Sequence, residues 1–232
     1  MLRTLTYLSH LDAQKRDIDP SGLDVLDVGA GNGAFVRALS SQSARAVGIE
    51  IDEDAVARAK EGSSGDIRLG SAQNLPFETA KFDLLTYIFS FHHIPEEAHN
   101  SALAEAVRVL RPDGRVFVAE PTVEGDMSKI VAVIDDETAV RTAALEALST
   151  LPQKLCLRCT ILPDYVLTRY YQSFDALLAN LVAVDAARSE KVILPENRDN
   201  MWREFKQRGR LTNRGFAIDQ PVRCMMLNSM HI

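Results

Sequence analysis

LDVGAGNG, residues 26–33, places three glycines within five positions, and the apolar run LDVLDV (23–28) leads into them. A short apolar run of this kind is typical of a buried strand. Glycine adopts backbone conformations that other residues avoid, and it lets the main chain approach a ligand closely. The helical pattern AFVRALSSQ (34–42) follows at once, with Phe35, Val36 and Leu39 on one face. The stretch therefore predicts a strand, a tight binding turn and a helix.

Strand and helix patterns continue to alternate up to residue 121. Further strands are expected at 45–52, 66–71, 81–89 and 115–120, and further helices at 54–60 and from Pro95 to Leu110. This alternation predicts an α/β fold: a Rossmann-like, doubly wound, mostly parallel sheet with helices on both faces.

The alternation ends after Pro121. Residues 128–151 and 174–190 have helical patterns, whereas 164–174 and 216–228 resemble strands; Pro221 in the last of these favours an edge position or a bulge. We expect residues 1–121 to form the ligand-binding core. Residues 122–232 are expected to supply covering helices, inserted after the fifth strand, and closing strands of the same domain.

Composition limits the function classes. The chain has 232 residues and a net charge of −6, which fits one globular domain and argues against a nucleic-acid partner. The locally basic segment 198–215 is interpreted as a helix with its aromatic residues, Trp202 and Phe205, buried and its cations in water. No apolar run reaches the roughly 20 residues of a membrane helix, so membrane insertion is not expected. His10 and Asp12 stand where a signal peptide would be apolar, so a cytoplasmic location is expected.

The chain contains three cysteines, which are too few for a disulfide framework. Cys156 and Cys159 form a C-x-x-C pair that we interpret as a chance spacing, with a redox pair as the alternative. A structural zinc would need a second pair, and Cys224 is the remaining cysteine.

The glycines could hold three kinds of ligand. A phosphate loop requires Lys and Ser or Thr after the last glycine, and Ala34 and Phe35 stand there. A dinucleotide turn, G-x-G-x-x-A, is matched by Gly29, Gly31 and Ala34. Asp27, however, would repel a pyrophosphate and would tolerate a nearby cation. The alternative role for Asp27 is structural, with its carboxylate accepting hydrogen bonds from the N–H groups of the loop.

VLDVGAGNGAF resembles the first motif of the class I S-adenosylmethionine (SAM)-dependent methyltransferases, D-x-G-x-G-x-G. VGIEID, GSAQNLPFETAKFD, FHHIP and EAVRVLRPDGRVFVAEP resemble the later segments of that family in the same order. The resemblance covers about residues 23–121 and is greatest to the UbiE-like, small-molecule branch. It implies a methyltransferase that uses S-adenosyl-L-methionine as cofactor and methylates a small-molecule acceptor by direct displacement.

The resemblance also implies which residues bind the cofactor. They are Asp27, Gly29, Ala30, Gly31, Asn32, Gly33, Glu50, Ile51, Ser71, Ala72, Gln73 and Ile88. In this scheme Glu50 binds the ribose hydroxyls, Asn32 lies near the methionine portion and Ile88 forms the floor of the pocket. Ser71 departs from the family, which usually has an Asp that accepts from the adenine amino group. A serine can still accept one hydrogen bond, and Gln73 or a backbone group could compensate.

His92 and His93 are the candidates for a catalytic base, because they follow the fourth strand and histidine titrates near neutral pH. At most one of them is expected to face the acceptor, and a role in positioning or loop structure is the alternative. Glu120 is a second pocket candidate, or else a solvated carboxylate at a strand end. His10, His99 and His231 are expected on the surface. No metal centre is expected, because no carboxylate accompanies the histidines at ligand spacing.

The covering helices are expected to build most of the acceptor pocket, since the N-terminal residues can form only a short lid. The aromatic residues of this region either line that pocket or belong to the core: Tyr165, Tyr170, Tyr171, Phe174 and Trp202. Two other functions stay open, a SAM- or S-adenosylhomocysteine-binding protein without activity and an NAD-dependent oxidoreductase. The acceptor, its reacting atom and a possible homodimer are left undecided.

Overall fold

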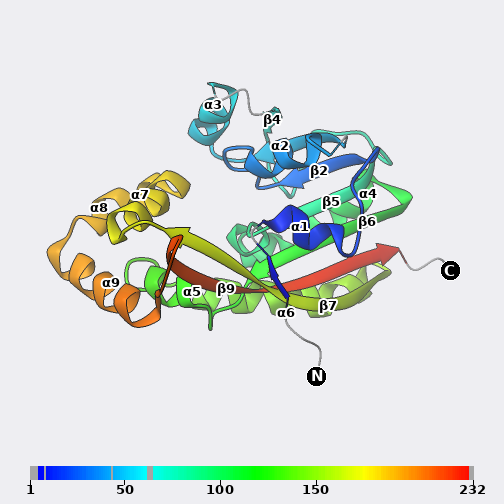
Figure 1. Cartoon of the computed structure of the whole chain (residues 1–232). Coiled ribbons are helices and arrows are strands. Elements are labelled where there is room, and N and C mark those ends of the chain that lie inside the picture. Colours follow the sequence, from blue (N-terminus) through cyan, green and yellow to red (C-terminus); the bar gives the residue numbers. More distant parts are fainter. Residues whose placement is uncertain (1–4, 8, 43, 62–64, 230–232) are drawn as a thin grey trace.

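A computed structural model describes residues 5–7, 9–42, 44–61 and 65–229 and contains a nine-stranded mixed sheet (Figure 1). The predicted parallel strands are all present: β2 (Asp24–Val28), β3 (Arg45–Glu50), β4 (Asp66–Leu69), β5 (Phe82–Ile88) and β6 (Leu110–Pro121). Their connecting helices are α2 (Ala34–Ser40), α3 (Glu53–Glu61) and α4 (His99–Val109). The predicted doubly wound α/β fold is therefore confirmed.

The strand order sets the position of the site. From one edge the order is β4-β3-β2-β5-β6-β9-β7-β1, where β9 is Gly215–Ser229, β7 is Leu157–Tyr171 and β1 is Leu5–Tyr7. The chain winds outward from β2 to β4, then crosses back to β5 and winds the other way. Ligands of open α/β sheets bind where this reversal occurs, beyond the carboxyl ends of the strands. Here that place is the gap between the ends of β2 and β5.

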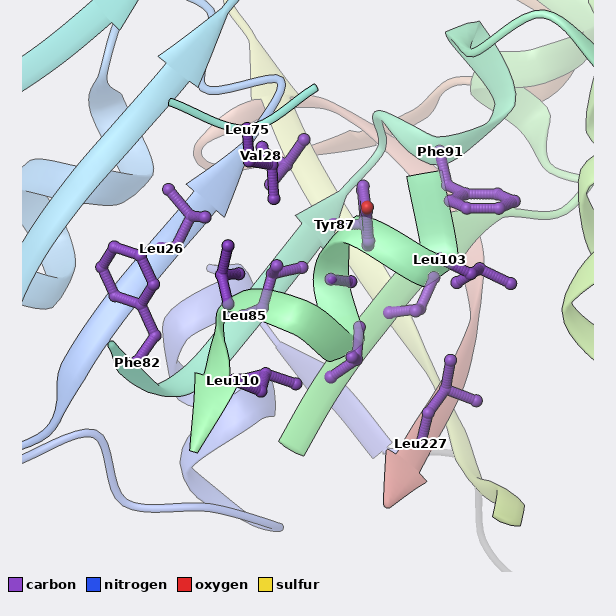
Figure 2. Packing of buried hydrophobic residues seen from close by; sticks show 14 of the residues in the cluster. Leu26, Val28, Leu75, Phe82, Leu85, Tyr87, Phe91, Leu103, Leu110 and Leu227 are labelled. Atoms are coloured by element: carbon purple, nitrogen blue, oxygen red, sulfur yellow. The ribbon is translucent and has the colours of Figure 1, made fainter. Parts of the chain in front are cut away.

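Helices cover both faces of the sheet. On one face α4 and α6 (Thr138–Lys154) pack against the strands, and Leu103, Ala106 and Leu148 are fully buried there. Figure 2 shows this cluster, with Leu85 and Tyr87 of β5 at its centre. On the other face α1 (His10–Lys15) and α2 pack against Leu84 and Phe117. β5 is thus apolar on both faces, as a central parallel strand should be.

Two helices predicted as continuous are interrupted by aspartates. Residues 128–151 form α5 (Asp126–Val131) and then α6, because the Asp136 carboxylate accepts from the Thr138 N–H (3.0 Å) and starts a new helix. Residues 174–190 form α7 (Phe174–Val184), η3 (Ala186–Arg188) and α8 (Ser189–Val192), because the Asp185 carboxylate accepts from the Ala187 N–H (2.9 Å). α9 (Pro195–Arg208) completes the cover.

The closing strands differ from the prediction in their position. β9 lies inside the sheet, antiparallel to both β6 and β7, so an edge position for this strand as a whole is wrong. The last residue of β6, Pro121, pairs with Val222, so Pro221 lies just beyond the β6–β9 ladder. The register of β7 against β9 shifts nearby, between Leu162 and Tyr165. The missing N–H of proline is tolerated at such a place. Four short elements of the described chain were not predicted: α1, β1, β8 (Arg210–Thr212) and η1 (Phe91–His93).

Candidate functional site

The glycine turn after β2 approaches the segment after β5. Gly29, Gly31 and Gly33 have φ of 77°, 54° and 75°, a conformation that favours glycine. A Cβ on Gly29 would lie 2.4 Å from the Ser90 Cβ, whereas a Cβ on Gly31 would meet nothing within 4 Å. Gly29 is therefore required by the fold, and Gly31 faces open space in which a ligand could lie.

Glu50, at the end of β3, holds the turn in shape. One carboxylate oxygen accepts from the Gly31 N–H (2.8 Å), and the other accepts from the N–H groups of Ile51 (2.7 Å) and Asp52 (3.1 Å). An ionised carboxylate can accept about four hydrogen bonds, so capacity remains for a ligand hydroxyl. Its role toward ribose stays a prediction.

Asp27 has a structural partner within the sheet. Its side chain is 2% exposed, and its carboxylate accepts from the Thr86 hydroxyl of β5 (2.7 Å). The partner of the Asp27 carboxylate is therefore a side chain of the neighbouring strand and, among the described residues, not the N–H groups of the glycine loop. Burial, together with the nearby charge of Glu50, raises the pKa of the Asp27 carboxyl to about 7, although the Thr86 hydrogen bond acts in the opposite direction.

The segment after β4 lies beside the end of β3, because the Gly70 N–H donates to the Glu50 carbonyl (2.9 Å). Ser71 follows it, and its hydroxyl oxygen is buried without a hydrogen-bond partner among the described residues. Leaving a buried hydroxyl unpaired costs about 1–3 kcal/mol, so a ligand group at this place would be favoured. Ala72 packs against the core, and Gln73 is exposed.

The other predicted cofactor residues are distributed around the same strand ends. Asn32 lies two residues before α2, and its side-chain oxygen accepts from the Ala34 N–H (3.1 Å). Ala30 and Gly33 are buried in the turn, Ile51 is exposed, and Ile88 is half-buried at the end of β5. The structure thus brings the predicted residues to one edge of the sheet.

His92 is buried at the end of β5 and forms a pair with Glu120 of β6. Its Nδ1 is hydrogen-bonded to one Glu120 oxygen, and the other Glu120 oxygen accepts from the Phe91 N–H (2.8 Å). Glu120 is 1% exposed, so the solvated strand-end alternative is wrong. A buried carboxylate needs such partners. Because Glu120 occupies Nδ1, the free nitrogen of His92 is Nε2.

The remaining histidines differ in their surroundings. The exposed His93 lies with its ring 4.1 Å from that of His92, and desolvation together with His92 lowers its pKa. His99 is 2% exposed and stacks on Phe91, and the half-buried His10 ring lies 2.6 Å from the Tyr165 hydroxyl. The surface prediction is therefore wrong for both, and burial lowers the pKa of His10 to about 3. His231 lies outside the described residues.

The cover contributes a carboxylate that the sequence analysis missed. Glu137, which precedes α6, points one oxygen toward His92 Nε2 at 3.9 Å and forms ion pairs with Arg141 and Arg188. Arg188 also binds Asp135 (2.8 Å), and Arg141 donates to the Ser128 hydroxyl (2.6 Å). The i, i+4 spacing of Glu137 and Arg141 indicates a helix pair, but nothing in the sequence connects them with His92.

The expectation that no carboxylate accompanies the histidines is wrong. Ligand atoms of His92, His93 and Glu137 lie within 4.8 Å of one another. Two guanidinium groups already bind Glu137, however, and they would repel a divalent cation at this place. The absence of a metal centre therefore stays a prediction.

The aromatic residues of the second half separate into two groups. Tyr165, Tyr171 and Phe174 are buried, which agrees with the interpretation that they belong to the core. Tyr170 is half-buried and Trp202 is 42% exposed, so the prediction that both aromatics of α9 are buried is wrong for Trp202.

A half-open cavity of about 550 Å³ lies away from these strand ends. It is bounded by α6, β7 and β9, and its lining includes Leu145, Cys159 and Met225. Cys159 and the exposed Cys156 are both free thiols. The cavity lies on the sheet face beneath α6, and none of the predicted site residues lines it.

Comparison with known proteins shows several relatives. Residues 26–118 match the family described as a methyltransferase domain. Methyltransferase GfsG of Streptomyces halstedii is 30% identical over 190 residues, covering 74% of this chain and 68% of its own. Demethylmenaquinone methyltransferase of Lactococcus lactis is 34% identical over 115 residues, covering 46% of this chain and 45% of its own length, so that match spans less than half of the relative.

The fold is shared with the crystal structure of the YcgJ protein of Bacillus subtilis, with a TM-score of 0.63 and 19% identity. That likeness covers 96% of this chain and 97% of YcgJ. None of the helices in the described part of the chain combines the length and the apolar character that crossing a bilayer requires.

Alanine substitutions at Gly29 and Gly31 should distinguish a glycine that close packing requires from one that only the positive φ favours. Gly29→Ala should lower the free energy of unfolding by about 2–4 kcal/mol, because the new methyl collides with Ser90 and the positive φ is unfavourable. Gly31→Ala should cost only about 1 kcal/mol, since it meets no neighbour. Urea unfolding measures the loss of stability in both variants, and equal losses would contradict the close approach at Gly29. In a Ser90→Gly background, the loss of stability caused by Gly29→Ala should be smaller.

The buried Asp27 should make stability depend on pH. Its pKa is raised in the folded state, so the native protein binds the extra proton, and stability contributed by the neutral carboxyl is lost as the pH rises from about 4 to 7. Asp27→Asn, which can still accept from Thr86, should remove this loss and be more stable than the parent at pH 8 by up to about 4 kcal/mol. Chemical unfolding at pH 4 and pH 8 tests this, and a parent that gains stability over this interval relative to the variant would contradict it.

Proposed function

Since the chain belongs to the class I SAM-dependent methyltransferases, we propose that it transfers the methyl group of SAM to a small-molecule acceptor. The observation that carries this proposal is the meeting of two features at the switch point of the sheet. The open glycine turn braced by Glu50 lies after β2, and the buried His92–Glu120 pair lies after β5.

The residues present fit the cofactor. The space beside Gly31 is open, the Ser71 hydroxyl lacks a partner among the described residues, and Glu50 retains acceptor capacity. We assign the turn 29–33, Glu50 and Ser71 to holding SAM, with the backbone of Gly31 in contact with it. When bound, SAM supplies a methyl group already activated on a sulfonium, so the work left to the protein is binding, alignment and the exclusion of water.

His92 would serve as the base for an acceptor that loses a proton on methylation. Glu120 holds the ring through Nδ1, which leaves Nε2 as the atom that accepts the proton. The imidazolium formed in this way would lie between the carboxylates of Glu120 and Glu137. Glu120 acts here as a positioning residue, because its contact is with His92 and not with the acceptor.

A small acceptor is supported by the nature of the relatives and by charge. The relative from Lactococcus lactis is named for demethylmenaquinone, a small molecule. The net charge of −6 disfavours the phosphate backbone of a nucleic acid. We propose that the cover, residues 122–229, forms the acceptor side of the site.

A second candidate is a protein of the same fold that binds SAM without using it. The observation that favours it is Ser71, where the family usually carries a carboxylate. Release of S-adenosylhomocysteine from SAM in the presence of a metabolite extract, followed by mass spectrometry, distinguishes the two. The dinucleotide alternative is set aside, because the chain belongs to a methyltransferase family.

Gly31→Val should weaken SAM binding. Its side chain would occupy the open space beside the turn, so the affinity measured by titration calorimetry should fall at least tenfold. Gly22→Val is the matched control, since Gly22 also has a positive φ and open surroundings but lies before β2. The control should bind SAM like the parent, and retention of full affinity by Gly31→Val would place the cofactor elsewhere.

His92→Gln should lower kcat by about 10²–10⁴, the usual contribution of a positioned base. S-adenosylhomocysteine binding should be unchanged, and Glu120→Gln should shift the pH profile of kcat through its effect on His92. His93→Gln should cause a smaller loss. Thermal melting of each variant separates loss of the base from loss of the fold, and an unaltered kcat in a folded His92→Gln enzyme would remove His92 from this role.

A further inference from the structure

The cavity beneath α6 has the size of a small-molecule site. Its volume of about 550 Å³ lies within the usual range for ligand pockets, roughly 300–1,000 Å³. One wall is α6 and the other is formed by β7 and β9. None of its lining residues has a role in the proposed methyl transfer, so a ligand here would be a second one. These residues are Leu145, Ser149 and Gln153 of α6, Leu157, Arg158, Cys159 and Ile161 of β7, and Arg223 and Met225 of β9.

The apolar part of the lining comes from all three elements. Leu145 of α6 and Cys159 of β7 pack against the main core cluster, and Met225 of β9 belongs to it. Ile161 is the Cα partner of Met225 across the β7–β9 ladder, so the two side chains share a face of the sheet. Ile161 is 67% exposed and continues the apolar surface to the rim of the cavity. An apolar ligand that removed this surface from water would be stabilised by it.

The polar part of the lining contains hydrogen-bond donors that have no partner. The Arg158 side chain forms no hydrogen bond or ion pair with the described residues. Arg223 binds a carboxylate, but only through Nε, which donates to both oxygens of Asp164 (2.8 and 3.0 Å). Its terminal nitrogens have no partner in the described part of the chain, and its side chain is 39% exposed. Donors of two guanidinium groups are therefore available to a ligand.

A positive charge remains at the cavity after the neighbouring carboxylates are counted. The lining contains no Asp or Glu, and Asp164 is a single carboxylate beside two arginines. Glu120 is the Cα partner of Arg223 on β6, but its two oxygens are bound by His92 and by the Phe91 N–H. The ion pair with Asp164 therefore offsets the charge of Arg223 and leaves that of Arg158.

We propose that this cavity binds an organic anion with an apolar body, such as a medium-chain carboxylate. The apolar body would cover the surface from Leu145 to Met225, and the carboxylate would accept from Arg158 and from the terminal nitrogens of Arg223. A guanidinium fork matches a planar carboxylate well. A cation would be repelled by the remaining charge, and a neutral head would be attracted less. The proposal does not depend on SAM or on methyl transfer.

Two cysteines report on occupancy of the cavity. Cys159 lines it, whereas Cys156 is exposed and lies outside it. The full chain without SAM is alkylated with N-ethylmaleimide at mildly alkaline pH, because burial raises the pKa of the Cys159 thiol. Mass spectrometry follows each thiol separately. With decanoate at about ten times its dissociation constant, alkylation of Cys159 should slow about tenfold, and that of Cys156 should be unchanged.

The head group is tested with two compounds of the same chain length, decanol and decyltrimethylammonium. Both should protect Cys159 much less than decanoate does, and equal protection by all three would overturn the assignment to an anion. Decanoate binding that leaves Cys159 unprotected would overturn the site. Protection of Cys159 that increases with protein concentration, without any decanoate, would make the cavity an interface between two copies of the chain and would also overturn the proposal.

Arginine variants test the donors by titration calorimetry. Arg158→Gln and Arg223→Gln should each weaken decanoate binding by about tenfold, as expected for loss of hydrogen bonds to a charged group. Arg169→Gln is the control, since Arg169 is also exposed on β7 but does not line the cavity. S-adenosylhomocysteine binding should be unchanged in all three, which separates this site from the proposed cofactor site. Parent-like decanoate binding by both cavity variants would contradict the assignment.

A filling variant tests the cavity itself. Ser149 and Thr150 are both exposed on α6, and both hydroxyls donate to the Glu146 carbonyl (2.7 and 2.9 Å), but only Ser149 lines the cavity. Ser149→Phe should therefore block decanoate binding and the protection of Cys159, whereas Thr150→Phe should behave like the parent. Thermal melting checks that both variants fold, and equal decanoate binding by the two folded variants would place the ligand elsewhere.

Discussion

The close approach of the turn after β2 to the segment after β5 is the constraint on which the site depends. No side chain fits at Gly29, because the Ser90 Cβ lies where its Cβ would be, and the Ser90 hydroxyl donates to the Val28 carbonyl (2.5 Å). This contact aligns the ends of β2 and β5, the two strands on either side of the reversal in strand order. As a result, the open turn around Gly31 and the buried His92 lie at the same edge of the sheet.

Three carboxylates at this edge differ because their surroundings differ. Asp27 is buried, and this burial raises its pKa to about 7 although the Thr86 hydroxyl donates to its carboxylate. Glu50 accepts three backbone N–H groups and keeps the turn in its conformation. Glu120 is also buried, but it is paired with an imidazole and an N–H group. The three carboxylates therefore have different roles, in the sheet, in the loop and beside the histidine, because different hydrogen-bond donors reach them.

The cover is attached to the core by buried charges as well as by apolar packing. One Glu137 oxygen lies near His92 Nε2 and pairs with Arg141, and the other pairs with Arg188, which links the start of α6 to η3. Breaking such a network leaves an unpaired buried charge, so its members depend on one another. The outer face of the same cover has a different character, with exposed apolar residues and ion pairs such as Arg198–Asp175 and Arg210–Asp219.

Apolar periodicity and glycine spacing act on the backbone locally, so they predicted the strands and helices up to Pro121. The family resemblance supplied the cofactor candidates from Asp27 to Ile88. The sequence also marked His92 and Glu120, although not their contact. The sequence pattern did not predict that β9 lies between β6 and β7, that His99 is buried and His10 half-buried, or that Glu137 faces His92 from 45 positions away. These features follow from packing between distant segments, and local pattern carries no information about which distant surfaces meet.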